Sequence, residues 1–344
     1  MKPPVILAID TSCDETAAAV SSGRRILSNV ISSQVNIHKK WGGVVPHLAK
    51  RAHQDKIEAV ISEALTRAKI VRTKIDAIAV TVGPGLAPAL EVGLKFAKNL
   101  ASELEKPLIS INHMEGHLLS SFALNSKGHT VRTEPTVFPA IGLLVSGGHT
   151  QLILVKDIGK YKLLGETLDD AAGEALDKLA KMLKLGYPGG PIIEEMAKKG
   201  DPDKIDLPVP MQHSKDYNFS FSGLKTAALY KIQKAKITKT YTYNMAASFQ
   251  KSVATSLTTK LIHAIKEFNP KTILLGGGVI SNLYIRQQIR SAVKPFNLPI
   301  HLPYSKKLFT DNAAMICIPA YFKYLKKDFV KKPATLDRQP SLSL

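Results

Sequence analysis

The chain has 344 residues, of which an ordinary 44% are hydrophobic, so it can bury the cores of two lobes and is not a disordered tail. Its formal net charge of +19 favours a polyanionic partner, nucleic acid first, although adaptation of a whole proteome to heat or salt would also raise it. Two cysteines, Cys13 and Cys317, exclude a disulfide framework, and no apolar run is long enough to span a membrane, so we expect a cytoplasmic protein without a signal peptide.

The first predicted element is a hairpin over residues 5–20, in which two strands flank a polar turn. A hairpin of similar shape returns at residues 143–155, where the turn is the Ser-Gly-Gly-His segment 146–149. Two such hairpins, each opening one half of the chain, indicate two related lobes. In a two-lobed nucleotide enzyme the turns would face each other across a cleft, and N–H groups of the second could bind phosphate oxygens. Two ordinary turns are the alternative.

Between the hairpins, hydrophobic periodicity predicts a helix over residues 47–68, a strand over 75–81 and a second helix over 88–104. The glycine loop 82–86 lacks the Gly-Lys-Ser/Thr ending of a P-loop, so we interpret it as a structural turn. These elements therefore build lobe I without indicating a mononucleotide site.

His113 and His117 follow a predicted strand at residues 107–111. On a helix, residues four apart lie on one face, so the two imidazoles could bind a single metal ion. Histidine pairs with this spacing also occur at helix ends without a metal, and the spacing leaves both interpretations open. A zinc-protease helix needs Glu directly after the first histidine, and Met114 occupies that position.

A polar segment at residues 125–136, rich in Ser, Gly, Thr and Pro, is predicted to connect the two lobes. We therefore expect residues 1–125 to form lobe I and residues 126–324 to form lobe II. The C-terminal segment 325–344 is expected to return to lobe I.

Lobe II is predicted to carry a helix that starts near Thr167 and ends near Lys184. Its carboxylates Asp170, Glu174 and Asp177 lie near one face and repel one another. They therefore need water, a cation or a hydroxyl-rich ligand.

Two glycine turns in lobe II, at residues 186–191 and 276–278, let a ligand approach the backbone. The second lies between a predicted strand and a helix, an arrangement in which a nucleotide base or ribose can lie against the backbone. Asp311 precedes the last predicted helix, over residues 312–327. It would either cap that helix or serve as a third metal ligand beside the histidines.

Seven motifs spread over residues 5–325 together resemble one family, the bacterial tRNA N6-adenosine threonylcarbamoyltransferases, also called glycoprotease or O-sialoglycoprotein endopeptidase-like proteins. The motifs are the segments 11–16, 113–117, 145–150, 169–174, 187–191, 219–226 and 310–312. The resemblance implies an α/β, two-lobed fold of the actin/Hsp70-like (ASKHA) type, with a cleft between the lobes.

The resemblance also implies an activity. Family members transfer the threonylcarbamoyl group from L-threonylcarbamoyladenylate, which is derived from ATP, to N6 of adenosine at position 37 of tRNAs that read ANN codons, and AMP is released. The implied partners are tRNA, a smaller paralogue similar to lobe I, a small ATPase, and a separate synthase that makes the adenylate. A membrane has no part in this reaction.

The site residues that the resemblance implies fall into three groups. One divalent metal ion per chain, Fe2+ or alternatively Zn2+, is bound by His113, His117 and Asp311. Glu15 corresponds to an acidic residue near the reaction centre. The adenylate contacts correspond to Leu144, Val145, Ser146, Gly147, Gly148, Asp177, Gly190 and Asn282.

Three other classes of protein fit parts of the pattern. A metalloprotease would use the histidine pair for peptide hydrolysis. An ATP-dependent small-molecule kinase of the same fold would not need His113. A non-catalytic tRNA-binding scaffold would explain the charge but would also be indifferent to loss of that histidine.

Overall fold

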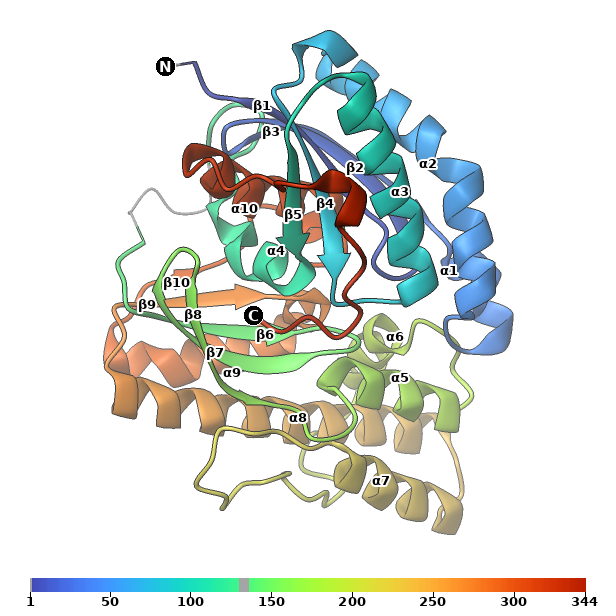
Figure 1. Ribbon diagram of the computed structural model, residues 1–344. Coiled ribbons are helices and arrows are strands. Elements are labelled where there is room, and N and C mark those ends of the chain that lie inside the picture. Colours follow the sequence, from blue (N-terminus) through green and yellow to red (C-terminus); the bar gives the residue numbers. More distant parts are fainter. Residues whose placement is uncertain (1, 130–135) are drawn as a thin grey trace. The chain divides into compact units, whose positions relative to one another are not determined.

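The structure is a computed structural model of the chain and describes residues 2–129 and 136–344 (Figure 1). Contacts within the chain divide it into two compact units, Met1–Glu134 with Leu302–Leu344, and Pro135–His301. The sequence-based division places the return of the chain to lobe I at residue 325, whereas the contacts place it at Leu302. Residues 130–135 of the predicted connection lie outside the described residues. Within those described ranges, no helix has the length and apolar composition needed to cross a membrane.

The first unit is built, in its described part, on a five-stranded sheet with strand order β3-β2-β1-β4-β5. The predicted first hairpin is confirmed, because β1 and β2 pair antiparallel, whereas β4 lies parallel to β1 and β5 parallel to β4. All residues of β1 are buried, which explains why its sequence is apolar without alternation. The strands are β1 (Val5–Asp10), β2 (Glu15–Ser22), β3 (Arg25–Ser33), β4 (Ala77–Gly83) and β5 (Leu108–Asn112).

Helices cover both faces of this sheet (Figure 1). Helices α2 and α3 share one core with Leu7 and Ile9 of β1, and their predicted positions are confirmed to within two residues. Helix α10 packs on β1 and β2 and also contacts α4; its residues Ala313–Ala320 are all buried. The helices are α1 (Val35–His38), α2 (Pro46–Ala68), α3 (Ala87–Glu103), α4 (His113–Leu119) and α10 (Ala313–Leu325).

The second unit repeats this plan, with a described sheet of order β10-β9-β6-β7-β8. Strand β6 pairs antiparallel with β7 and parallel with β9, so the second predicted hairpin is confirmed. The strands are β6 (Ala140–Val145), β7 (Thr150–Asp157), β8 (Lys160–Glu166), β9 (Thr272–Gly276) and β10 (Ile300–His301). The helices are α5 (Ala172–Met182), α6 (Gly189–Ala197), α7 (Ser222–Lys234), α8 (Lys239–Phe268) and α9 (Leu283–Val293).

The start of α5 differs from the prediction of a helix beginning near Thr167. The Asp169 carboxylate accepts hydrogen bonds from the backbone N–H groups of Phe221 (2.7 Å) and Ser222 (3.2 Å), at the start of α7. These bonds hold Asp169 outside a helix, and α5 begins only at Ala172. Asp169, which was expected to lie at the start of α5, therefore stabilises the start of α7.

A buried lysine holds the polar excursion at residues 201–217 against α8. The side chain of Lys260 is 2% exposed, and its Nζ donates to the Ser214 carbonyl oxygen (3.2 Å) and hydroxyl and to the Asp216 carbonyl oxygen (2.6 Å). Lysine is rarely buried unless its donors are satisfied. Lys260 thus acts as a structural anchor for this excursion.

The C-terminal segment crosses the carboxyl ends of β4 and β5 in the first unit. The Gln339 N–H donates to the Val82 carbonyl (2.7 Å), and the Asn112 side-chain amide donates to the Ser343 carbonyl (3.0 Å). Leu342 packs against the hydrophobic core of this unit. A Cβ at Gly83 would overlap the Gln339 carbonyl, so this glycine makes room for the segment.

Deleting residues 339–344 removes these backbone and side-chain hydrogen bonds together with the apolar contact of Leu342. We expect the free energy of unfolding to fall by about 2–4 kcal/mol, measured by urea denaturation of the full chain. Replacing the exposed Ser341 with Ala is the control, because the backbone hydrogen bonds remain. Equal stability of the deletion variant and the parent would contradict this account.

Candidate functional site

Helix α4 carries both histidines of the predicted metal site. Asn112, the last residue of β5, caps this helix: its side-chain oxygen accepts from the N–H groups of Met114 (2.8 Å) and Glu115 (3.3 Å). The cap makes His113 the first helical residue and places His117 one turn later on the same face. Both imidazoles are buried, and their rings meet edge to face with centroids 4.8 Å apart.

Asp311 completes a group of three potential ligands. Asn312, and not Asp311, caps α10, since the Asn312 side chain accepts from the Met315 N–H (3.0 Å). The Asp311 carboxylate is therefore not used for capping, and its Oδ1 lies 3.1 Å from Nε2 of His117 and 3.4 Å from Nε2 of His113. Of the two roles considered for Asp311, the structure excludes the helix cap.

The geometry of these three side chains fits a divalent metal ion. One ligand atom from each lies within 4.8 Å of the others. Bonds of about 2.0–2.2 Å from one ion would set neighbouring ligand atoms about 3.0–3.4 Å apart, which matches the two distances to Asp311. Nδ1 of His113 faces Ser12 Oγ (3.1 Å) and Asp10 Oδ2 (3.5 Å), the outer contacts that typically orient a metal-binding histidine. Two imidazoles and one carboxylate suit Fe2+ or Zn2+.

Each side chain of this group changes the pKa of its neighbours. Burial alone would lower the pKa of His113, but the Asp311 and Asp10 carboxylates beside it raise that pKa to about 10. Burial opposes ionisation of Asp311, yet His113 and His117 hold its pKa well below the usual value. Burial lowers the pKa of His117, and the charge of His113 adds to this effect. The group therefore already contains a partly buried negative ligand, Asp311, and a neutral imidazole, His117.

Glu15, the predicted catalytic residue, begins β2 in the same unit. Burial raises the pKa of its carboxyl group well above the usual value, and the Asp14, Asp311 and Asp10 carboxylates raise it further. A carboxylate with a raised pKa can accept a proton near neutral pH. The raised pKa means that Glu15 holds a proton more readily than an ordinary carboxyl group does.

In the second unit, the predicted phosphate turn joins β6 to β7. The Ser146 N–H donates to the His149 carbonyl (2.8 Å), and the first turn of α5 rests on this loop, because the Glu174 N–H donates to the Gly147 carbonyl (3.0 Å). A Cβ at Gly147 or Gly148 would meet no protein atom within 4 Å, and neither residue has a positive φ. Protein packing therefore does not explain these two glycines, whereas close approach of a ligand would.

Leu144 and Val145, predicted together with this turn, are buried in β6, so only their backbone can contact a ligand. Gly277, in the second glycine turn, has a φ of +91°, and a Cβ there would overlap the Val145 carbonyl. The turn at residues 276–278 therefore abuts the end of β6. This places the two predicted ligand turns side by side at the carboxyl ends of β6 and β9, where α/β proteins commonly bind ligands.

The three carboxylates predicted on α5 have different roles. Asp170 lies before the helix and pairs with Lys178 (2.6 Å) and Lys225 (2.6 Å), and Glu174 also pairs with Lys178 (2.8 Å). Asp177 instead accepts hydrogen bonds from the backbone N–H groups of Gly189 (2.7 Å) and Gly190 (3.0 Å). Of the three carboxylates, Asp177 is the one that contacts another predicted site residue, Gly190. Lysines neutralise Asp170 and Glu174.

Asn282 is buried at the start of α9. Its side-chain oxygen accepts from the Ile285 N–H (3.1 Å), and its amide donates to Gln250 Oε1 (2.7 Å). The side chain is thus largely engaged by the protein itself. It follows η4 (Gly278–Ser281), a 3-10 helix that contacts both β6 and α5.

Asp10 and Ser12 were not predicted as site residues, although both contact His113. The signal that could have identified them is the strand ending in a buried carboxylate at the same sheet edge as the histidine pair. Sequence reasoning could not pair these segments, because more than 100 residues separate Asp10 from His113.

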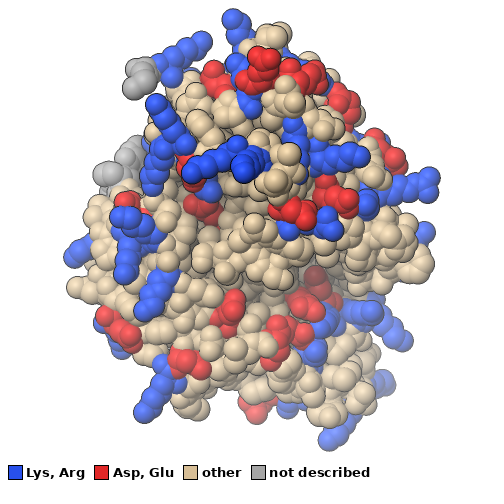
Figure 2. Space-filling model, viewed as in Figure 1, with Lys and Arg blue, Asp and Glu red and all other residues tan. Residues whose placement is uncertain are grey.

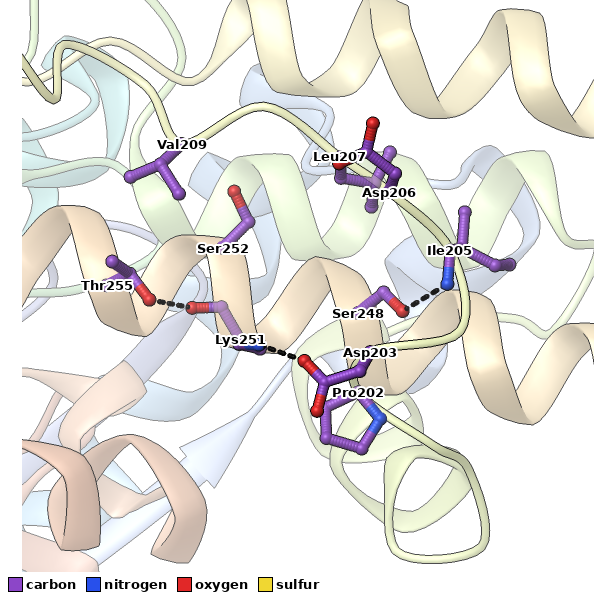
Figure 3. A pocket seen from close by; sticks show the side chains of 10 residues that line it. All are labelled: Pro202, Asp203, Ile205, Asp206, Leu207, Val209, Ser248, Lys251, Ser252 and Thr255. Atoms are coloured by element: carbon purple, nitrogen blue, oxygen red, sulfur yellow. Dashed lines mark hydrogen bonds and ion pairs between the residues drawn. The ribbon is translucent and has the colours of Figure 1, made fainter.

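A hollow of about 190 Å³ lies elsewhere in the second unit, between α8 and the excursion at residues 201–217 (Figure 3). None of the predicted site residues lines it. Most of its polar side chains already have partners: for example, Lys251 pairs with Asp203, and Ser248 Oγ accepts from the Ile205 N–H (3.2 Å). We therefore do not place the reaction in this hollow.

Solved structures with a similar fold cover nearly the whole chain. HypF of T. kodakarensis matches 97% of this chain and 49% of its own length, with a TM-score of 0.61 and 16% identity. Component A of the Acidaminococcus fermentans (R)-2-hydroxyglutaryl-CoA dehydratase matches 94% of this chain and 99% of its own, with a TM-score of 0.54 and 16% identity. Likenesses at this identity show the fold alone, and they confirm the predicted α/β, actin/Hsp70-like class.

Sequence comparison identifies the family. The family model described as tRNA N6-adenosine threonylcarbamoyltransferase matches residues 25–318. A protein of that name from Thermosipho africanus (strain TCF52B) is 46% identical over 341 residues, covering 99% of this chain and 100% of its own. One from Clostridium perfringens (strain SM101 / Type A) is 47% identical over 348 residues, covering 100% and 99%. The chain therefore belongs to the tRNA N6-adenosine threonylcarbamoyltransferase family.

Proposed function

We propose that this acyltransferase transfers the threonylcarbamoyl group of L-threonylcarbamoyladenylate to N6 of adenosine 37 in tRNAs that read ANN codons, with release of AMP. Its family membership supports tRNA modification as the reaction. The observation that carries the site assignment is the convergence of His113, His117 and Asp311 within 4.8 Å. The net charge of +19 agrees with a polyanionic acceptor.

One divalent metal ion would be held by His113, His117 and Asp311, with Fe2+ preferred and Zn2+ as the alternative. When bound, it supplies a Lewis acid that can polarise the carbamoyl carbonyl. Asp10 and Ser12 contact Nδ1 of His113 and would thereby leave Nε2 as the nitrogen that binds a metal ion.

The adenylate is proposed to bind at the carboxyl ends of β6 and β9. Backbone N–H groups of Gly147 and Gly148 would hold its phosphate, which becomes the phosphate of AMP, since the Ser146 N–H is already bonded to the His149 carbonyl. The segment from Leu144 to Gly148, together with Asp177, Gly190 and Asn282, would contact the rest of the nucleotide. The open space beside the glycines of the turn supports this placement.

The transfer requires a new bond from N6 to the carbamoyl carbon and breakage of the bond from that carbon to the phosphate oxygen. The electron pair of the broken bond leaves with AMP, and the attacking amine loses a proton. We assign this proton to the Glu15 carboxylate, whose raised pKa suits it to accept one. Positioning of two large substrates would supply much of the remaining acceleration.

No observation favours the alternative activities. A peptidase of the zinc-helix type needs Glu at the position of Met114, and the glycine turns do not form a P-loop. The proposed partners besides tRNA are a smaller paralogue resembling the first unit, a small ATPase and a separate adenylate synthase. The proposed location is the cytoplasm, where such tRNAs act.

Replacing His113 with Ala should remove one metal ligand and the imidazole that contacts Asp10 and Asp311. We expect metal content after dialysis to fall severely and modified nucleoside, measured by mass spectrometry, to fall at least about 100-fold. The control is His213→Ala, since His213 is exposed and lies outside the site. A metal-free His113→Ala protein, shown to be folded by circular dichroism, that still modifies tRNA at the parental rate would refute the assignment.

Removing the metal from the assembled wild-type protein with a chelator should abolish modification while leaving the fold intact. We expect activity to fall about 100-fold or more and to return on addition of one divalent ion. Parallel reconstitution with Fe2+ and Zn2+ under anaerobic conditions decides between the two. Full activity of demonstrably metal-free protein would contradict the proposed chemistry.

Side chains added at Gly147 should block the adenylate without disturbing the fold, because the space beside this residue is open. We expect Gly147→Ala and Gly147→Val to raise KM for the adenylate progressively, by about tenfold or more for Val. Gly223→Ala is the matched control, because Gly223 also faces open space but lies at the exposed start of α7. An unchanged KM in the Val variant would contradict the placement of the adenylate phosphate at this turn.

A further inference from the structure

One long stretch of the second unit carries only positive charge. Between residues 217 and 266 the sequence contains lysines but no Asp or Glu. Four of these lysines gather in residues 229–240, which we call the basic turn; it comprises the end of α7, the connection, and the first residues of α8. They are Lys231, Lys234, Lys236 and Lys239. Four positive charges in so short a segment create a local positive potential that attracts polyanions such as nucleic acid.

The basic turn is also the most exposed part of its helix pair. Helix α7 buries Leu224 and Ala228 against its neighbours α5 and α8, and leaves its opposite face to solvent (Figure 1). All four lysines are exposed, as are Tyr230 (59%) and Ile237 (48%). Figure 2 shows Lys and Arg side chains projecting from the region where Figure 1 draws α7.

Among the described residues, no acidic side chain pairs with these four lysines. Other lysines between residues 217 and 266 do have acidic partners: Lys225 pairs with Asp170 (2.6 Å) and Lys251 with Asp203. Within residues 2–129 and 136–344, none of the four lysine side chains of the basic turn makes an ion pair or a hydrogen bond. Four like charges without partners repel one another, so they add nothing to the stability of this segment.

Helix electrostatics do not account for the pattern either. Lysines in the last turn of α7 complement the negative end of its dipole, which is an ordinary reason for Lys231 and Lys234. Lys239, however, is the first residue of α8, where the helix dipole disfavours a cation. Lys236 belongs to neither helix. The positive charge is therefore present where the fold itself does not favour it.

We infer that the basic turn is a tRNA-binding surface of this protein, with its lysines on backbone phosphates and the Tyr230 ring against a base or ribose. The identity of the nucleic acid rests on the proposed function. Tyr230 and Lys234 are four residues apart on α7 and so share one face, which allows one nucleotide to contact both. Lysine is depleted at protein–protein interfaces but is a usual phosphate ligand, and this favours RNA over a protein partner.

The test is equilibrium binding of unmodified tRNA to the full chain assembled with its partners, without adenylate. The variant replaces the four lysines of the basic turn with Gln. We expect its Kd to rise about 30-fold or more at 0.1 M salt and the slope of log Kd against log salt to fall by about two to four, because each lost phosphate contact contributes about 0.9 to the slope.

A matched variant separates this surface from net charge. Four exposed lysines of the same unit, outside the basic turn, are replaced with Gln: Lys156, Lys160, Lys162 and Lys271. The net charge changes equally, and we expect Kd to stay within about threefold of the parent. Equal losses in the two variants would overturn the inference, because they would show that tRNA responds only to overall charge.

The aromatic contact has its own test. Tyr230→Ala should raise Kd about fivefold or more, whereas Tyr230→Phe keeps the ring and should bind as the parent does. In modification assays the four-lysine variant should show raised KM for tRNA with kcat unchanged, since the reaction centre is untouched.

Failure of this inference is distinguishable from failure of the proposed function. If the parent binds and modifies tRNA while the four-lysine variant keeps the parental Kd, only the inference is overturned. If the variant loses its protein partners but retains the Kd of the isolated chain for tRNA, the surface is a protein interface and the inference is again overturned. A parent that binds but does not modify tRNA would overturn the proposed function and leave the surface assignment supported by the Kd values.

Discussion

A buried imidazole held between two carboxylates is the interaction on which the first unit depends. His113 lies between Asp10, at the end of β1, and Asp311, just before α10. Burying such charges costs several kcal/mol each unless they are paired, so the three segments must pack correctly before any of them is stable in place. The same contacts orient the ligand atoms, and folding of this unit therefore assembles the candidate metal centre.

The second unit relies on backbone groups more than on side chains. Its two ligand turns are joined by close packing, because Gly277 must lack a side chain to fit against Val145 and Gly173 must lack one to fit against Ser146. Gly147 is free of such constraints. Packing within the protein therefore requires glycine at positions 173 and 277 but not at the neighbouring position 147. This pattern is expected where a ligand, and not the protein, comes close to the backbone of Gly147.

Much of this arrangement could be predicted from the sequence, because local patterns determine it. Apolar periodicity located α2 and α3, the two hairpins were recognisable, and the spacing of His113 and His117 indicated one helix face. Three features could not be predicted, because they depend on tertiary contacts. The first eight residues of α10 are all apolar, so no apolar stripe indicates which of its faces packs on a sheet. Lys260 has the sequence signature of an ordinary surface lysine, and only the covering excursion buries it. Only the structure shows that Asn312 caps α10 and so leaves Asp311 to contact the histidines.

The contact between Asn112 and Ser343 has a practical consequence for handling the protein. One amide side chain both caps the helix of the two histidines and binds the carbonyl of the penultimate residue. An affinity tag or fluorescent fusion attached after Leu344 would pull on that carbonyl and, through it, on the first turn of α4. Tags belong at the opposite terminus, and preparations carrying a C-terminal fusion should be compared with untagged protein before measurements on the candidate metal centre are interpreted.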